Sequence, residues 1–281
     1  MSRARDDRPL VANARMYALN SDVAGGWDRL FQWIAQEAGV PLVPVAHAPP
    51  EPLETLWLRA DLGCAFMCGY PFTTWRREAV SQPRLVAAAV PSPSRYEGRA
   101  VYCTDIVVRA DSDHSTIDGL RGTRFGYTVD HSQSGWQAPR KFFARRAHDA
   151  GGAWFGATTG PLQTPRAVVD ALLEGRIDAG PLDSWWHDLL KRHEPAKAAH
   201  LRVIASTPLT PAPPLVCAHG VAEATRRRLA AAFERVADAP PLQELRDRLL
   251  LRGFATVNAG DYAILADDAR ETDSLGYRIL R

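Results

Sequence analysis

The segment FGYTVDHSQSGWQAPRKFF, residues 125–143, joins three kinds of local structure in one short stretch. Residues 125–129 are aromatic and β-branched, which predicts a short strand. Residues 132–135 form a polar turn, and residues 136–146 have helical spacing of apolar side chains. A strand that leads through a hydroxyl-rich turn into a helix leaves backbone N–H groups free at the positive end of the helix dipole. We therefore expect an anion-binding turn here.

The turn itself is rich in hydrogen-bond donors. Ser132 and Ser134 supply hydroxyl groups, Gln133 belongs to the same polar run, and Gly135 supplies an unhindered backbone N–H. The competing interpretation is that Ser134 serves only as the N-cap of the following helix. The S-x-S-G pattern alone does not separate these two interpretations.

Bulk composition is typical of a folded globular protein. The chain has 281 residues, of which 46% are hydrophobic and 23% charged, enough for two modest domains or one large one. The net charge of +2 indicates neither nucleic-acid binding nor an acidic membrane surface. The basic run at residues 226–228 falls in an amphipathic helix pattern, which favours a solvated helix face.

The cysteines do not form a metal-binding pattern. The chain contains no C-x-x-C, and no cysteine has a histidine at metal-ligand spacing, so we expect no metal and no cofactor. We interpret the four cysteines as small buried hydrophobic residues and leave a Cys103–Cys217 pair open.

The first part of the chain alternates strand and helix patterns. These predict strands over residues 11–19, 41–46 and 62–67, and helices over residues 27–40 and 53–59. This order is the signature of a parallel sheet covered by helices. The carboxyl ends of such strands line the ligand crevice in open α/β sheets, and Tyr17, Gly69 and Tyr70 lie near two of these ends. A buried core tyrosine is the competing interpretation for both rings.

The remainder of the chain repeats this alternation. Further strands are predicted over residues 85–90, 100–109, 177–182, 200–207 and 215–219, and further helices over residues 167–173, 185–192, 222–237 and 242–251. Thr164 and Asp183 are expected to cap the helices that follow them. The tail after Gly253 is expected to be a short return helix or a loop.

Several motifs occur together in one order along the chain. They are DLGCAFMCGYPF, YCTDIVVRADS, LRGTRFGYTVDHSQSG, VVDALLEGRIDAGPLDS, VIASTPLTPAPPLV and RGFATVNAGDYAIL. In this combination the chain resembles the phosphate/phosphonate-type substrate-binding proteins of ABC transporters, over nearly its whole length. That resemblance implies an α/β, two-lobed, type 2 periplasmic-binding-protein fold with a ligand cleft between the lobes.

The resemblance also implies where the lobes divide. Residues 1–102 and 207–281 would form one lobe and residues 103–206 the other. Two crossing segments, near residues 102–104 and 206–211, would join them.

Ligand-binding positions carry over from the family residue by residue. Those implied are Tyr17, Gly69, Tyr70, Ser132, Gln133, Ser134, Gly135 and Asp183. Asp183 matches the acidic position that faces the ammonium group of amine-bearing phosphonates, although it is equally suited to be an N-cap.

The function implied is capture of a small oxyanion, phosphonate- or phosphate-like, for an ABC transporter permease. The family is periplasmic, whereas residues 1–20 lack the apolar core of a signal sequence, so a cytoplasmic location stays open, as does a mature form with a new start. No apolar segment is long enough to insert into a membrane. The alternatives are a ligand sensor, or an enzyme of the same fold acting on a small cofactor-precursor metabolite. For the enzyme, His187 lies four residues after Asp183 on a predicted helix, where a partly exposed surface histidine is the competing interpretation.

Overall fold

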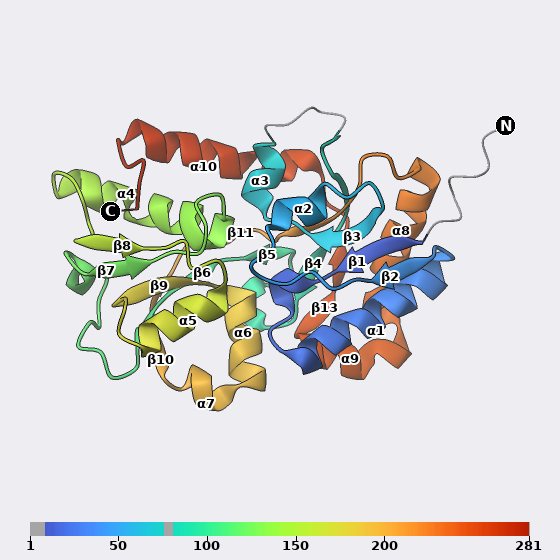
Figure 1. The fold of residues 1–281 in the computed structure, drawn as a ribbon, viewed down its shortest axis with the longest axis horizontal. Coiled ribbons are helices and arrows are strands. Elements are labelled where there is room, and N and C mark those ends of the chain that lie inside the picture. Colours follow the sequence, from blue (N-terminus) through green and yellow to red (C-terminus); the bar gives the residue numbers. More distant parts are fainter. Residues whose placement is uncertain (1–8, 76–80, 281) are drawn as a thin grey trace. The chain divides into compact units, whose positions relative to one another are not determined.

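The computed structural model describes residues 9–75 and 81–280 of the chain. Contacts divide it into two compact units, each with its own sheet and helices (Figure 1). Unit 1 consists of Met1–Val101 and Pro211–Asp261, and unit 2 of Tyr102–Thr210 and Tyr262–Arg281. Residues 1–8 of the predicted first lobe lie outside the described residues.

Unit 1 is built on a mixed sheet. Its strands, in spatial order, are β13 (Leu251–Ala255), β4 (Arg84–Pro91), β12 (Pro214–Cys217), β3 (Leu62–Phe66), β1 (Leu10–Asn13) and β2 (Leu42–Pro44). Strand β1 pairs in parallel with both β2 and β3, which confirms the parallel arrangement predicted for the first three strands. Strand β12 runs antiparallel between β3 and β4, and β13 pairs antiparallel with β4.

The helices of unit 1 follow the predicted pattern with shifted boundaries. They are α1 (Ser21–Ala38), α2 (Leu53–Trp57), α3 (Gly69–Thr73), α8 (Glu223–Arg235) and α9 (Gln243–Leu249). Helix α1 begins earlier than predicted because the Asn20 side chain accepts the N–H of Val23 at 3.0 Å and caps it there. It ends, as predicted, at Gly39, whose φ of 58° is left-handed. Gly69 and Tyr70, which were expected near the end of the third strand, begin helix α3.

Unit 2 is built on a second mixed sheet. Its strands, in spatial order, are β10 (Leu201–Ser206), β6 (Thr104–Arg109), β9 (Ala179–Asp183), β7 (Arg124–Gly126) and β8 (Ala157–Thr159). Strand β6 is antiparallel to β10 and β9, whereas β7 is parallel to β8 and β9. The long strand predicted over residues 100–109 is divided at Cys103, because β5 (Val101–Tyr102) pairs separately with β11 (Thr210–Pro211).

The helices of unit 2 include one irregular start. A π-helical turn (Gln133–Gln137) runs directly into α4, and the other helices are regular. The set is α4 (Ala138–Asp149), α5 (Pro165–Leu173), α6 (Ser184–His193), α7 (Pro195–Ala198) and α10 (Ala263–Ser274). The side chains of Thr164 and Asp183 cap α5 and α6, as predicted. In Figure 1, α4 and α10 lie on one side of this sheet and α5 and α6 on the other.

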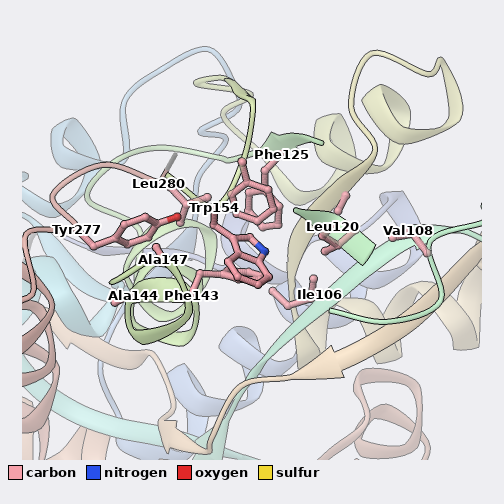
Figure 2. Packing of buried hydrophobic residues seen from close by; sticks show 12 residues of the cluster. Ile106, Val108, Leu120, Phe125, Phe143, Ala144, Ala147, Trp154, Tyr277 and Leu280 are labelled. Atoms are coloured by element: carbon pink, nitrogen blue, oxygen red, sulfur yellow. The ribbon is translucent and has the colours of Figure 1, made fainter. Parts of the chain in front are cut away.

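An aromatic cluster holds the core of unit 2 together. Phe125 at the centre of β7 stacks on Phe155 with ring centroids 4.4 Å apart and meets Phe143 of α4 edge-on at 5.8 Å. Figure 2 shows Tyr277 and Leu280, from the C-terminal tail, in the same cluster. The strand and the helix on either side of the polar turn are therefore fixed to each other by buried aromatic rings.

The C-terminal tail packs with unit 2, where the predicted boundaries had assigned it to the first lobe. Arg140 of α4 is 5% exposed and donates to Asp273 at 2.8 Å, to the carbonyl of Arg278 at 3.0 Å and to that of Ala269 at 3.3 Å. The chain consequently passes between the units after Val101, Thr210 and Asp261, once more than predicted.

Replacing Arg140 tests this role. In Arg140→Met two carbonyl groups of the tail lose their donor, so we expect the free energy of unfolding to fall by about 1–3 kcal/mol in chemical denaturation. Arg145→Met is the matched control, since Arg145 is exposed on the same helix, and it should change stability by less than about 0.5 kcal/mol. Equal effects of the two substitutions would contradict the assignment.

Candidate functional site

The polar turn of unit 2 begins with a side-chain cap. Ser132 precedes the π-helical turn, and its Oγ accepts the N–H of Gly135 at 3.0 Å. The cap is thus Ser132, not Ser134 as the competing interpretation had it. The N–H groups of Gln133 and Ser134 come before the first intrahelical bonds and have no acceptor within the helix. They lie at the positive end of the dipole of the continuous helix formed with α4.

Close packing requires glycine at position 135. A Cβ there would overlap with Thr128 Oγ1 and would lie 2.9 Å from Thr128 Cβ and 3.0 Å from Ser132 Oγ. The Thr128 hydroxyl therefore packs directly against the backbone of Gly135. Thr128 is 6% exposed, and its Oγ1 has no hydrogen-bond partner in the described part of the chain. Buried hydroxyl groups in native proteins almost always have a hydrogen-bond partner, so Thr128 Oγ1 is an exception.

Ser134 is anchored through its backbone and not through its side chain. Its carbonyl accepts the Thr104 hydroxyl at 3.0 Å, while its own hydroxyl has no hydrogen bond within the described residues. Thr104, which is 1% exposed, also donates its N–H to Thr207 Oγ1 at 2.9 Å. The turn is consequently tied to both segments that were predicted to cross between the lobes.

Asp183 lies beside the same anchor. It is the register partner of Thr104 in the β6–β9 pair, so Asp183 and Ser134 flank one residue. Asp183 Oδ1 accepts the N–H groups of Trp185 at 2.9 Å and Trp186 at 3.0 Å. Its capping role is therefore real, and its contact with a ligand amine stays a prediction.

The predicted site residues of unit 1 have a different setting. Tyr17 lies in a 3₁₀ turn (Arg15–Tyr17), is fully buried, and packs edge-on against Phe66 with centroids 4.8 Å apart. Gly69 opens helix α3 and is buried, and Tyr70 follows it half-buried. Their contact with a ligand stays a prediction.

His187 has another partner than the one considered from the sequence. It is 1% exposed rather than at the surface, and its Nδ1 lies 2.8 Å from Asp105 Oδ2. Ser206 donates its hydroxyl to the other oxygen of Asp105 at 2.7 Å. The histidine thus belongs to a buried network at the start of β6. The sequence analysis did not identify Asp105, Thr104 or Thr128 as site residues. Their hydroxyl and carboxyl groups at predicted strand ends were the only signal that could have indicated them.

All four cysteines are buried, which confirms their interpretation as small hydrophobic residues. Cys103 belongs to unit 2 and Cys217 to unit 1. Burial raises the pKa of the Cys217 thiol to about 11 and that of Cys64 well above its usual value. Within residues 9–75 and 81–280, no group of histidine, cysteine and acidic side chains is arranged to hold a metal ion.

Two surface hollows lie elsewhere and contain none of the predicted site residues. One in unit 1, about 420 Å³, is lined by Arg84, His219 and Arg226 among others. Both arginines there are already bonded to Glu223, whose pKa they help lower to about 2, and to backbone carbonyls. The other, about 380 Å³ in unit 2, mixes Arg124 with the carboxylate of Asp178.

Residues 17–262 match the sequence family described as "ABC transporter, phosphonate, periplasmic substrate-binding protein", and the chain belongs to this family of substrate-binding proteins. No curated protein sequence matches it. Among the described helices, none combines the length and the apolar character needed to cross a membrane.

Solved structures establish the fold as that of two-lobed type 2 periplasmic binding proteins. A binding component of a phosphonate ABC transporter from Pseudomonas aeruginosa superposes with a TM-score of 0.79 at 16% identity, covering 96% of this chain and 88% of its own. PhnD1 from Prochlorococcus marinus, solved with methylphosphonate, gives 0.75 at 17% identity, with coverage of 94% and 98%. A Xanthomonas citri protein solved with ATP gives 0.63 at 16% identity, with coverage of 95% and 98%.

The packing at Gly135 gives a direct test of the turn. Gly135→Ala should destabilise the protein by about 1–3 kcal/mol, because its Cβ overlaps with the Thr128 hydroxyl. Adding Thr128→Ala removes that oxygen and should restore part of the loss. Gly25→Ala is the control: Gly25 lies in α1 with open space around it, and alanine there should stabilise by about 0.5–1 kcal/mol. Failure of Thr128→Ala to restore any stability would show that this overlap is not the cause.

Proposed function

We propose that this chain is a solute-binding protein that captures a small phosphonate- or phosphate-like oxyanion at the turn of residues 132–135. The observation that carries the proposal is the state of Ser134. Its carbonyl accepts a hydrogen bond from Thr104, while its hydroxyl has no partner among residues 9–75 and 81–280 and its N–H has no acceptor within the helix. Membership of a phosphonate-binding family and the relative solved with methylphosphonate support the same ligand class.

The chemistry of the turn suits a tetrahedral oxyanion. Its charged oxygens would accept the N–H groups of Gln133 and Ser134 and the Ser134 hydroxyl, so several neutral donors and a helix dipole solvate the charge without a buried cation. Gly135 contributes by its missing side chain, since its own N–H is bonded to Ser132. Ser132 stabilises the turn by accepting that N–H at its Oγ.

Further contacts complete the proposal. Asp183, which adjoins Thr104, would accept an ammonium group of an amine-bearing phosphonate while keeping its capping bonds. Tyr17, Gly69 and Tyr70 of unit 1 stay proposed ligand contacts on the strength of the family resemblance alone. We further propose delivery to an ABC transporter permease and a periplasmic location, both of which the family description supports.

Ser134→Ala is the cleanest test of the turn, because the Ser134 hydroxyl makes no bond in the described chain whereas Ser132 is a structural cap. With methylphosphonate at 100 times its dissociation constant, the wild-type protein should gain about 2.7 kcal/mol in stability, visible as a thermal shift. Ser134→Ala should leave the unliganded melting temperature unchanged and weaken binding about tenfold. The exposed Ser115→Ala serves as control and should bind like the wild type. Full affinity in Ser134→Ala would refute the assignment.

Asp183→Asn tests the second contact. Asparagine keeps an N-cap oxygen but loses the negative charge, so the fold should persist. We expect its affinity for 2-aminoethylphosphonate, measured by calorimetry, to fall about tenfold while that for methylphosphonate changes little, because only the former carries an ammonium group. Equal losses for both ligands would leave Asp183 with its capping role alone.

A further inference from the structure

Buried oxygen atoms without hydrogen-bond donors gather around the polar turn. In the described chain, Thr128 Oγ1, Gln133 Oε1 and Gln137 Oε1 are all buried and have no partner. These three residues are 6%, 2% and 8% exposed. Leaving a buried oxygen without a donor is unfavourable, so three such atoms in residues 128–137 call for an explanation.

Two of the three atoms are carboxamide oxygens and the third is a hydroxyl oxygen. Gln137 donates its Nε2 to the carbonyl of Asp130 at 3.2 Å, which a carbonyl can accept only from the nitrogen end of the amide, so the unpaired end is an oxygen. A carboxamide oxygen accepts and never donates. At Thr128 the hydroxyl can do either, but it too has no partner. The turn therefore offers N–H donors to a ligand's charged oxygens and, within the same few residues, oxygens that need a donor from elsewhere.

Oxyanions differ in their ability to meet this second need. A singly protonated phosphonate or a hydrogen phosphate has charged oxygens for the N–H groups and one P–OH group to donate. A sulfonate has charged oxygens but no O–H. Resting on the function proposed above, we propose that this turn selects oxyanions that retain an acidic proton, and that Gln133 is the specificity-determining residue whose Oε1 accepts it.

Gln133 is chosen over its neighbours on structural grounds. Its side chain makes no hydrogen bond in the described chain, so replacing it breaks no protein contact. Gln137, in contrast, holds the Asp130 carbonyl. The backbone N–H of Gln133 belongs to the same residue and is one of the two donors proposed for the anion, which places donor and acceptor at one position.

Four ligands distinguish two possible hydrogen-bond donors: the acidic O–H of the ligand and an ammonium group. These are methylphosphonate, 2-aminoethylphosphonate, methanesulfonate and 2-aminoethanesulfonate, each titrated into the wild-type protein by calorimetry. We expect both phosphonates to bind at least about tenfold more tightly than the sulfonate of the same chain. If each phosphonate bound no more tightly than the sulfonate of the same chain, the inference would be overturned, while the proposed binding of an oxyanion at the turn would stand. Binding of the two amino compounds alone, whichever acid they carry, would also overturn it, because the ammonium group would then be the donor.

Gln133→Met then tests the residue, since methionine has similar length and no comparable acceptor. We expect phosphonate affinity to fall about tenfold with unliganded stability retained, because a buried unpaired amide has been removed. Gln36→Met, exposed on α1, is the control and should change neither. An unchanged phosphonate-to-sulfonate ratio in Gln133→Met would overturn the inference and assign the preference to ligand charge. Absence of binding by all four ligands would instead refute the proposed function itself.

Discussion

The contact between the Thr128 hydroxyl and the backbone of Gly135 constrains everything at the candidate site. It permits the helix to begin close against the end of the preceding segment, with Ser132 Oγ accepting the Gly135 N–H at 3.0 Å. That arrangement leaves the next donors, the N–H groups of Gln133 and Ser134, without intrahelical acceptors. Any side chain at position 135 would push the turn away and with it the donors that the proposed oxyanion needs.

A second constraint ties this turn to the rest of unit 2. Thr104 donates its hydroxyl to the Ser134 carbonyl, exchanges hydrogen bonds with Thr207, and pairs in register with Asp183. Next to it, the buried Asp105 is held by His187 and Ser206. The donors proposed for an anion and the Asp183 carboxylate proposed for an amine thus both adjoin Thr104, at the start of β6. Because these groups are held by buried hydrogen bonds, little reorganisation is needed when a ligand binds.

Local signals in the sequence predicted local structure well. Helix caps at Thr164 and Asp183, the left-handed Gly39 and the parallel pairing of the first three strands were all readable from residue type and spacing. Long-range features were not. Strand β13 was not predicted: its first residue was given to a helix over residues 242–251 and the rest to the end of that helix and the tail, because its pairing with β4 leaves no local mark. The tail was assigned to the wrong unit, since the bond between Arg140 and Asp273 joins residues far apart in sequence.

The same division applies to the site. The serine-rich turn could be predicted from its residue types. The roles of Thr104, Thr128 and Asp105 could not, because they depend on contacts with residues elsewhere in the fold. A titration of ¹⁵N-labelled protein with methylphosphonate, followed by backbone amide chemical shifts, tests the central claim most directly. We predict that the largest shifts fall on the amides of Gln133 and Ser134, as expected for N–H groups that begin to donate to an oxyanion. Saturable binding with the largest shifts in another part of the chain, and none in this turn, would contradict the account.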